Sequence, residues 1–389
     1  MAINNRIADF QAELTAWRRD IHAHPETAFE ERRTAALVAE KLASFGIEVH
    51  RGLAGTGVVG TLKGKKDGGR SIGLRADLDA LHMPEHNEFA HRSTNAGRMH
   101  ACGHDGHTTM LLGAAKYLAE TRNFEGTVHF IFQPAEENEG GGKRMVEEGL
   151  FDKFPVESVY GLHNWPGLPV GQFAVRPGPM MAAYNIFELT VVGKGSHGAM
   201  PHQGIDPVVA ASQIVIGFQT IASRNTHPLD AAVVTVTQIH GGDTWNVIPD
   251  SVVLCGTTRA FKPEVQDVIE HGMRRVAEGV CQAMGAKLDW RYERRYPATV
   301  NTPAETELAA KAAATVVGAS NVQRDPMLTM GSEDFAYMLL ARPGCYIWMG
   351  NGTECAPLHN TRYDFNDEAL AVGASYWAKL VETILGRAG

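Results

Sequence analysis

Met99-His100-Ala101-Cys102-Gly103-His104-Asp105-Gly106-His107 is the stretch that decides the fold. It places one thiol and three imidazoles directly ahead of an apolar helical pattern that continues to about Glu120. Strand-like runs stand on both sides of this helix, at Ile72–Leu78 and Thr127–Phe132, and another follows at Ser158–Leu162. Strands that alternate with helices predict an α/β layered sheet. In such sheets ligands bind beyond the carboxyl ends of the strands, where these motifs fall.

Along the rest of the chain, the alternation of helices and strands is interrupted once. From about Ala183 the predicted order is strand, helix, strand, strand, helix, strand, which is the ferredoxin-like pattern. After this insertion the alternation of helices and strands resumes, with runs at Thr306–Val317, Cys345–Met349 and Asn366–Leu385. We therefore predict the α/β class, with a mixed-sheet α/β/α main domain (residues 1–182 and 298–389) and an inserted β-α-β-β-α-β domain (183–297).

Composition excludes several classes of protein. A net charge of −8 argues against a general binder of nucleic acid or of anionic membranes. The longest apolar runs, such as Val208–Ile221, are too short and too interrupted to span a bilayer, and the first residues lack a signal-peptide pattern. Five cysteines form a sparse, odd set that implies no disulfide framework. We expect a cytoplasmic protein that binds neither nucleic acid nor membranes.

Three further segments offer side chains that bind metals. They are Gln133–Glu137, Gly161–Asn164 and Pro357–Asn360, and each closes or follows a strand-like run. Thiolate, imidazole and carboxylate groups are ligands of zinc and of its neighbours. A set that converges from several strand ends is what a metal hydrolase requires.

The carboxylate pair Glu136-Glu137 follows an apolar strand. Because adjacent side chains on an extended segment point apart, we expect one carboxylate to bind metal and the other to face the substrate and move protons. The alternative is a solvated acidic loop, since Glu139 and three glycines follow.

The other candidates carry different weights. Cys102, one residue from His104 at a helix entrance, is interpreted as a ligand in preference to a buried structural thiol. His163 and His359 are weak signals individually. Asp77 and Asp79 end a strand and either orient ligating imidazoles or form a cap or turn. We interpret His22, His24, His107, His129 and His240 mainly as core or surface histidines, although His107 could support the site.

In the inserted domain, Gly193–His202 is dense in glycine and histidine, and Asn246–Pro249 and Gly256–Arg259 flank another strand. A histidine, an amide and a guanidinium can hold an oxyanion and a substrate carboxylate. A surface rich in loops explains the same spacing equally well.

These motifs together resemble the amidohydrolase branch of the dimetal aminoacylase/carboxypeptidase superfamily. That branch includes hippurate hydrolases, bacterial N-acyl-amino-acid amidohydrolases and plant hydrolases of indole-3-acetyl-amino acids. The resemblance covers essentially the whole chain, and its motifs are Arg18–Glu26, Arg75–Asp79, Met99–His107, Gln133–Glu137, His163, Ser196–Pro207, Met330–Phe335 and His359. Sister carboxypeptidases and deacylases begin their metal site with His-x-Asp, whereas this chain has Asp77-Leu78-Asp79 and leaves His104 to fill that role.

The resemblance implies two divalent metal ions, zinc first, with manganese, cobalt or nickel as alternatives. It implies Glu136 as the general base, a bridging ligand for which the Cys102 thiolate is the candidate, and metal ligands at Cys102, His104, Glu137, His163 and His359. The inserted domain corresponds to a dimerisation lid, from which His197 reaches the active site of the partner subunit. We therefore expect a homodimer or higher homo-oligomer.

The expected reaction is hydrolysis of the amide bond of an N-acyl-L-amino acid, with Asn246 and Arg259 holding the substrate carboxylate. A dipeptidase or carboxypeptidase of the same superfamily is the alternative among enzymes. A non-catalytic metal-dependent binding protein on the same fold is the alternative from another class.

Overall fold

The computed structural model describes residues 3–137 and 139–386, so both extreme ends of the predicted main domain and Asn138 lie outside it. The chain forms two compact units. Unit 1 comprises Met1–Met180, Val300–Met327 and Asp334–Gly389, and unit 2 comprises Met181–Thr299 and Leu328–Glu333. The predicted inserted domain, 183–297, lies within unit 2, which also takes in the short segment 328–333 from the predicted main domain.

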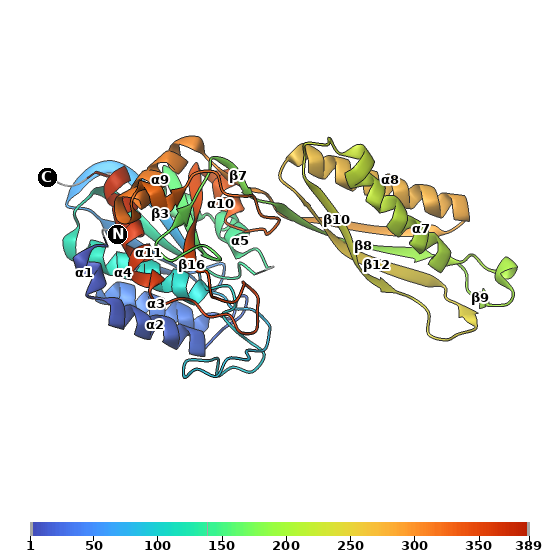
Figure 1. Cartoon of the computed structure of the whole chain (residues 1–389), viewed down its shortest axis with the longest axis horizontal. Helices are drawn as coiled ribbons and strands as arrows, with labels where there is room; N and C mark the ends of the chain where they lie inside the picture. Colours follow the sequence, from blue (N-terminus) through green and yellow to red (C-terminus); the bar gives the residue numbers. More distant parts are fainter. Residues whose placement is uncertain (1–2, 138, 387–389) are drawn as a thin grey trace. The chain divides into compact units, whose positions relative to one another are not determined.

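Unit 1 is built on an eight-stranded mixed sheet of strand order β1-β2-β4-β3-β5-β16-β6-β15 (Figure 1). In that order the strands are Glu48–Leu53, Gly57–Lys63, Glu125–Gln133, Lys66–Asp77, Ser158–Pro166, Gly344–Gly352, Phe173–Ala174 and Val322–Gln323. The central strands β4, β3, β5 and β16 run parallel to one another. Their carboxyl ends therefore meet at one edge of the sheet, where ligands bind in folds of this kind.

Helices cover both faces of this sheet (Figure 1). Helix α4 packs against α2 and α11, and α11 also packs against α9, whereas α5 packs against α10. The helices of unit 1 are α1 (Asn5–Ala8), α2 (Gln11–Ala23), α3 (Arg32–Ser44), α4 (His104–Thr121), α5 (Gly141–Glu147), α6 (Leu150–Lys153), α9 (Pro303–Val317), α10 (Ala336–Ala341) and α11 (Ala369–Ile384).

Helix α4 places the Cys-x-His pair at the carboxyl edge of the sheet. Its residues from His104 to Ala115 are all buried: the polar side chains lie in its first turns, and the stretch from Met110 to Ala115 is apolar. The helix begins after Gly103, whose φ of +89° is in the left-handed region. A Cβ atom at Gly103 would lie 2.3 Å from Asn164 Nδ2, so only glycine fits this helix entrance.

Unit 2 contains a four-stranded antiparallel sheet of order β10-β12-β8-β13. Helices α7 and α8 bury one face of the sheet in a core of their own. The elements, in chain order, are β8 (Ala183–Val192), α7 (Pro207–Thr220), β10 (Ala232–His240), β12 (Ser251–Ala260), α8 (Pro263–Met284) and β13 (Lys287–Tyr296). This is the ferredoxin-like order, and with the mixed sheet of unit 1 it confirms the predicted fold class.

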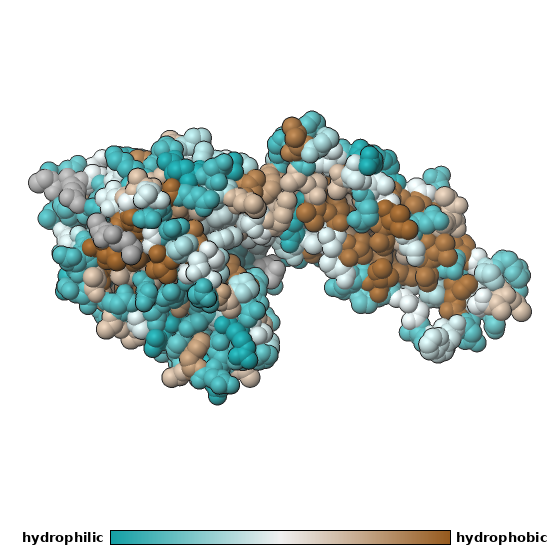
Figure 2. All heavy atoms as spheres, viewed as in Figure 1, coloured by the Kyte–Doolittle hydropathy of each residue, from teal (hydrophilic) through white to brown (hydrophobic). Residues whose placement is uncertain are grey.

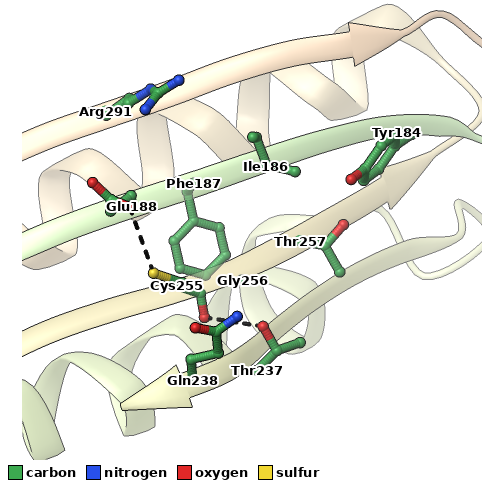
Figure 3. Close-up of a pocket in the computed structure, with 10 residues that line it drawn as sticks. All are labelled: Tyr184, Ile186, Phe187, Glu188, Thr237, Gln238, Cys255, Gly256, Thr257 and Arg291. Carbon is green, nitrogen blue, oxygen red and sulfur yellow. Dashed lines mark hydrogen bonds between the residues drawn. The ribbon is translucent and has the colours of Figure 1, made fainter. Parts of the chain in front are cut away.

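The surface of unit 2 has two notable features. The sheet face opposite the helices has a hollow of about 400 Å³, lined by polar and charged side chains that include Glu188, Cys255 and Arg291 (Figure 3). Elsewhere apolar side chains gather at the surface (Figure 2). On α7 these exposed residues are Val208, Val209 and Ile216. Among the helices of the described ranges, none combines the length and the hydropathy that a bilayer crossing requires.

Candidate metal centre

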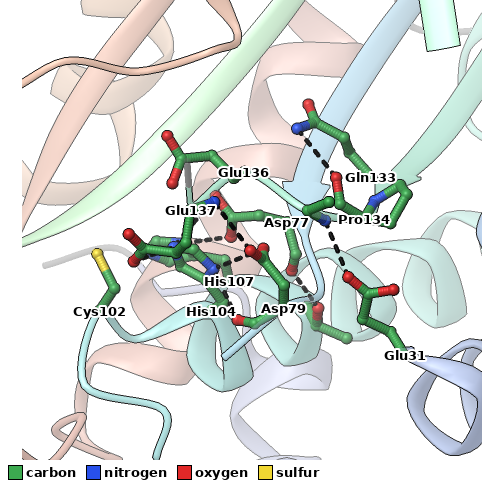
Figure 4. Close-up of polar contacts among 12 residues, drawn as sticks. Glu31, Asp77, Asp79, Cys102, His104, His107, Gln133, Pro134, Glu136 and Glu137 are labelled. Atoms are coloured by element: carbon green, nitrogen blue, oxygen red, sulfur yellow. Dashed lines mark hydrogen bonds and ion pairs between the residues drawn. The ribbon is translucent and has the colours of Figure 1, made fainter. Parts of the chain in front are cut away.

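The predicted ligand residues come together at the carboxyl edge of the parallel strands of unit 1. Figure 4 shows three of them, Cys102, His104 and Glu137. They are supplied by the start of α4, the turn after β4, the strand β5 and the loop between β16 and α11. Within each of three groups the potential ligand atoms lie within 4.8 Å of one another. These groups are Cys102 with His104 and His163, Cys102 with Glu137 and His359, and His104 with Glu136 and Glu137.

The closest approaches link these groups into one centre. Cys102 Sγ lies 3.3 Å from His163 Nε2. Glu137 Oε1 lies 3.3 Å from His359 Nε2 and 3.9 Å from His104 Nε2. The His104 side chain is only 1 % exposed, whereas that of His359 is 53 % exposed. The centre is therefore buried at its base and open to solvent at His359.

Two buried atoms of this centre have no hydrogen-bond partner among the described residues: His104 Nε2 and Glu137 Oε1. The approaches of Glu137 Oε1 to the two imidazoles do not satisfy hydrogen-bond geometry. A buried polar atom without a partner costs free energy. A divalent cation between these atoms would satisfy both, so the residues fit a metal site.

The imidazoles of His104 and His163 are oriented by hydrogen bonds on their other nitrogen. His104 Nδ1 lies 2.9 Å from the backbone oxygen and 3.2 Å from Oδ1 of Asp79, and it donates to them. His163 Nδ1 donates to the backbone oxygen of Asn164 at 2.6 Å. In both rings Nε2 is thereby left as the metal-binding nitrogen.

Without metal, His104 and Cys102 both hold a proton. Burial alone would lower the pKa of His104, but the Asp77, Asp79 and Glu137 carboxylates raise it to about 10. Burial and the neighbouring Glu137 and Glu136 raise the pKa of Cys102, so without metal it is a thiol. The nearby N-terminus of α4 would by itself favour the thiolate of Cys102. Burial and carboxylates outweigh that effect, and metal binding must displace protons from both groups.

Asp77 forms its histidine hydrogen bond with His107, whereas Asp79 forms its own with His104. Asp77 Oδ1 accepts a hydrogen bond of 2.7 Å from His107 Nδ1, and Oδ2 accepts one of 2.7 Å from Arg75. His107 Nε2 accepts a hydrogen bond of 2.9 Å from the backbone N–H of Asn164. Both nitrogens of His107 are thus engaged by the protein, and His107 supports the strand ends that carry the centre.

Glu136 and Glu137 do not diverge as residues of an extended segment would. One oxygen of each carboxylate lies within 4.8 Å of the other and of His104. Both residues follow Ala135, whose φ of +53° turns the chain at the end of β4. Both carboxylates therefore reach the centre, and the Glu136 side chain is buried with 6 % exposure.

The three candidates of unit 2 do not form one group. His197 lies on β9 (Ser196–His197), which pairs with β11 (Val247–Ile248), and the backbone N–H of Gly198 donates to the Asn246 oxygen at 2.7 Å. Arg259 lies at the opposite end of β12, eight residues from Ser251, or about 26 Å at the usual rise per residue. Asn246 and Arg259 of one chain therefore cannot hold the same carboxylate.

The sequence analysis assigned no role to two buried residues that organise the centre, Arg75 and Asn164. The guanidinium of Arg75 donates hydrogen bonds to the side chains of Gln133, Asp77 and Asp334, and so it links neighbouring segments at the end of the sheet. The side chain of Asn164 bonds the Cys102 oxygen. The sequence feature that could have revealed Arg75 is a charged residue within an apolar strand. For Asn164 it is the position next to a candidate ligand.

Comparison with known proteins identifies the family of this site. The model of Peptidase family M20/M25/M40 matches residues 73–383, which include the whole of the centre. The chain belongs to this family. The predicted resemblance to its amidohydrolases is thereby confirmed.

Individual relatives match over nearly their full lengths. The hippurate hydrolase of Campylobacter jejuni is 40% identical over 96% of this chain and 97% of its own. The N-acetylcysteine deacetylase of Bacillus subtilis is 39% identical over 97% of this chain and 98% of its own. The solved structure of the Bacillus subtilis YXEP protein, described as a dinuclear metal binding peptidase from the M20 family, superposes with a TM-score of 0.85. It is 36% identical and covers 97% of this chain and 99% of its own.

Proposed function

We propose that this protein is a metal-dependent amidohydrolase that cleaves N-acyl-L-amino acids into a carboxylic acid and a free amino acid. The observation that carries the proposal is a set of five ligand side chains around unpartnered buried atoms, with the carboxylate of Glu136 beside them. A protein that only bound metal would have no need of this additional carboxylate. Relatives named hippurate hydrolase and N-acetylcysteine deacetylase support N-acyl substrates.

The proposed ligands of two divalent ions are Cys102, His104, Glu137, His163 and His359. Cys102 belongs to two of the ligand groups, as His104 and Glu137 also do, and of these the family resemblance favours the Cys102 sulfur as the bridge. Zinc is the first choice because the set mixes thiolate, imidazole and carboxylate, and manganese, cobalt or nickel are the alternatives. Elemental analysis should find close to two equivalents of metal per chain, and Cys102→Ser should lower that content. Full metal content in this variant would remove Cys102 from the site.

When bound, the two cations would lower the pKa of a water molecule and polarise the substrate carbonyl. Glu136 is the proposed general base. It takes a proton from the water as the oxygen attacks the carbonyl carbon, and it gives that proton to the amine nitrogen as the C–N bond breaks. Asp79 holds His104 for this reaction, and Asp77 holds His107 behind it.

Substrate recognition is assigned to unit 2, which we propose acts as a lid. Arg259 is half-buried, and no carboxylate of the described residues pairs with it, so it suits the carboxylate of the substrate. His197 is proposed to stabilise the oxyanion and Asn246 to contact the substrate carboxylate region. Since Asn246 and Arg259 of one chain lie far apart, two copies of the chain would have to supply them.

This arrangement requires a homodimer or a higher homo-oligomer. Two features of unit 2 support it: β10 is an edge strand of the sheet, and α7 exposes Val208, Val209 and Ile216. Edge strands and apolar patches are the surfaces that symmetric dimers bury. A cytoplasmic location is proposed on the composition and on five free cysteines.

One substrate screen separates the alternatives. The metal-reconstituted protein should hydrolyse hippurate or N-acetyl-amino acids faster than dipeptides with a free amine. Preference for free-amine dipeptides would instead identify a dipeptidase or carboxypeptidase. Metal binding without turnover of any of these compounds would identify a non-catalytic binding protein.

A further inference from the structure

Glu31 is a fully buried carboxylate that joins three loops of unit 1 (Figure 4). Its Oε1 accepts hydrogen bonds from the backbone N–H groups of Ala135 at 2.9 Å and Phe29 at 3.0 Å. Its Oε2 accepts a hydrogen bond of 2.6 Å from the Thr56 hydroxyl. One of these loops is the turn that carries Glu136.

That turn is strained at the residue that Glu31 holds. Ala135 has a φ of +53°, a conformation that residues with a side chain adopt only when their surroundings impose it. Its N–H is bound by Glu31, and its oxygen accepts a hydrogen bond of 2.9 Å from Gly141. Two residues further on, Asp79 Oδ2 binds the N–H of Glu137 at 2.9 Å. Carboxylates therefore hold the turn on both sides of Glu136.

Glu31 is costly to bury. No Lys, Arg or His of the described residues forms an ion pair with it, and burial, together with the Asp79 carboxylate, raises the pKa of Glu31 to about 7. An apolar side chain would fill this space without that cost. The contribution of Glu31 therefore lies in the hydrogen bonds that it accepts.

We propose that Glu31 is a positioning residue, which fixes the strained turn at Ala135 so that Glu136 and Glu137 both face the metal centre. It acts through the backbone of Ala135 and touches neither substrate nor metal. The inference rests on the roles proposed above for Glu136 and Glu137.

The test compares Glu31→Ala with Glu26→Ala as a matched control. Glu26 also accepts hydrogen bonds from two backbone N–H groups and a threonine hydroxyl, but it does so at the start of α3. Each variant is titrated with cobalt(II), with binding followed by the visible spectrum, and is assayed on hippurate. In Glu31→Ala cobalt affinity should fall about 10- to 100-fold, and kcat should fall by up to about 100-fold with KM little changed. Glu26→Ala should change neither quantity.

A conservative variant, Glu31→Gln, distinguishes a positioning role of Glu31 from a general contribution to protein stability. In Glu31→Gln the amide oxygen can still accept from Ala135, and the amide nitrogen can donate to the Thr56 hydroxyl oxygen. This variant should recover most of the cobalt affinity and of kcat. Wild-type values in a folded Glu31→Ala protein, or equal losses in Glu31→Ala and Glu26→Ala, would overturn the proposal.

A second pair of variants decides the matter if Glu31→Ala does not fold. Thr56→Val removes one hydrogen bond to Glu31, and Thr61→Val removes a similar hydroxyl contact to His129 elsewhere on unit 1. Only Thr56→Val should weaken cobalt binding, and unchanged binding in that variant would overturn the proposal. The cobalt titration remains decisive even if hippurate and related amides are not substrates, so the two proposals can fail separately.

Discussion

Asp79 Oδ2 accepts a hydrogen bond of 2.9 Å from the backbone N–H of Glu137, and the same carboxylate faces Nδ1 of His104. One side chain thus orients two proposed ligands from different segments. Asp79→Asn replaces one acceptor oxygen by a donor, so one of these contacts must be lost. Metal affinity should fall about 10- to 100-fold while the fold is kept, as measured by zinc or cobalt titration.

Asp67→Asn is a suitable control for this prediction, because Asp67 also binds a backbone N–H but does so at the surface. An Asp79→Asn protein with wild-type affinity would show that the ligands are held without this carboxylate.

Substitutions of Glu136 and Glu137 should have different effects on turnover and on metal content. Glu136→Gln keeps the shape of the side chain but removes the base, so kcat should fall by about 10²- to 10⁴-fold while two metal ions stay bound. Glu137→Gln should instead lose metal, because a neutral amide oxygen is a poorer ligand than a carboxylate. Turnover and elemental analysis on the same preparations check both. Normal turnover by Glu136→Gln would refute the base assignment.

The main elements of the fold follow from local sequence patterns. Helix α8, for example, begins at Pro263 and ends before Gly285, and these are residue types that start and stop helices. The sequence did not predict β2 or the two-residue strands β6 and β15. Pairing with neighbours forms these strands, and two residues carry no periodicity from which a strand could be recognised.

For the candidate site, the sequence predicts which types of ligand residue are present, but it does not predict how their side chains are arranged. The spacing of Cys102 and His104 at a helix entrance is a local feature. The pair Glu136 and Glu137 follows a bend at Ala135, and the N–H of Ala135 binds a carboxylate more than one hundred positions earlier in the chain. No local pattern shows such a bond, and none shows that Asn246 lies ahead of the start of β12 whereas Arg259 lies near its end.

Stability should depend on pH through His22, which lies fully buried between Asp105 and Glu85. Burial alone would lower its pKa, but these carboxylates raise it to about 9. Because the folded pKa exceeds the unfolded value of about 6.5, the stabilisation is complete below pH 6.5 and is lost as the pH rises through 9.

His22→Gln should therefore lower the free energy of unfolding by about 3 kcal/mol more at pH 6 than at pH 9.5, from the size of the pKa shift. Urea unfolding of the metal-free protein measures the difference. The half-exposed His24 supplies the control variant, His24→Gln, which removes an imidazole without removing a buried one. An equal loss at both pH values in His22→Gln would contradict the prediction.

The last prediction concerns the lid and the assembly. If His197 of one subunit completes the metal centre of the other, His197→Ala and Glu136→Gln should each be inactive alone and should complement each other when co-expressed. A mixed dimer isolated through two different tags contains one site with both residues intact and one with neither. It should show about half of the wild-type activity per dimer, since one of its two sites is complete. No recovery in such a dimer would mean that His197 acts within its own chain or not at all. A catalytically competent monomer, detected by sedimentation under assay conditions, would exclude the shared site more directly.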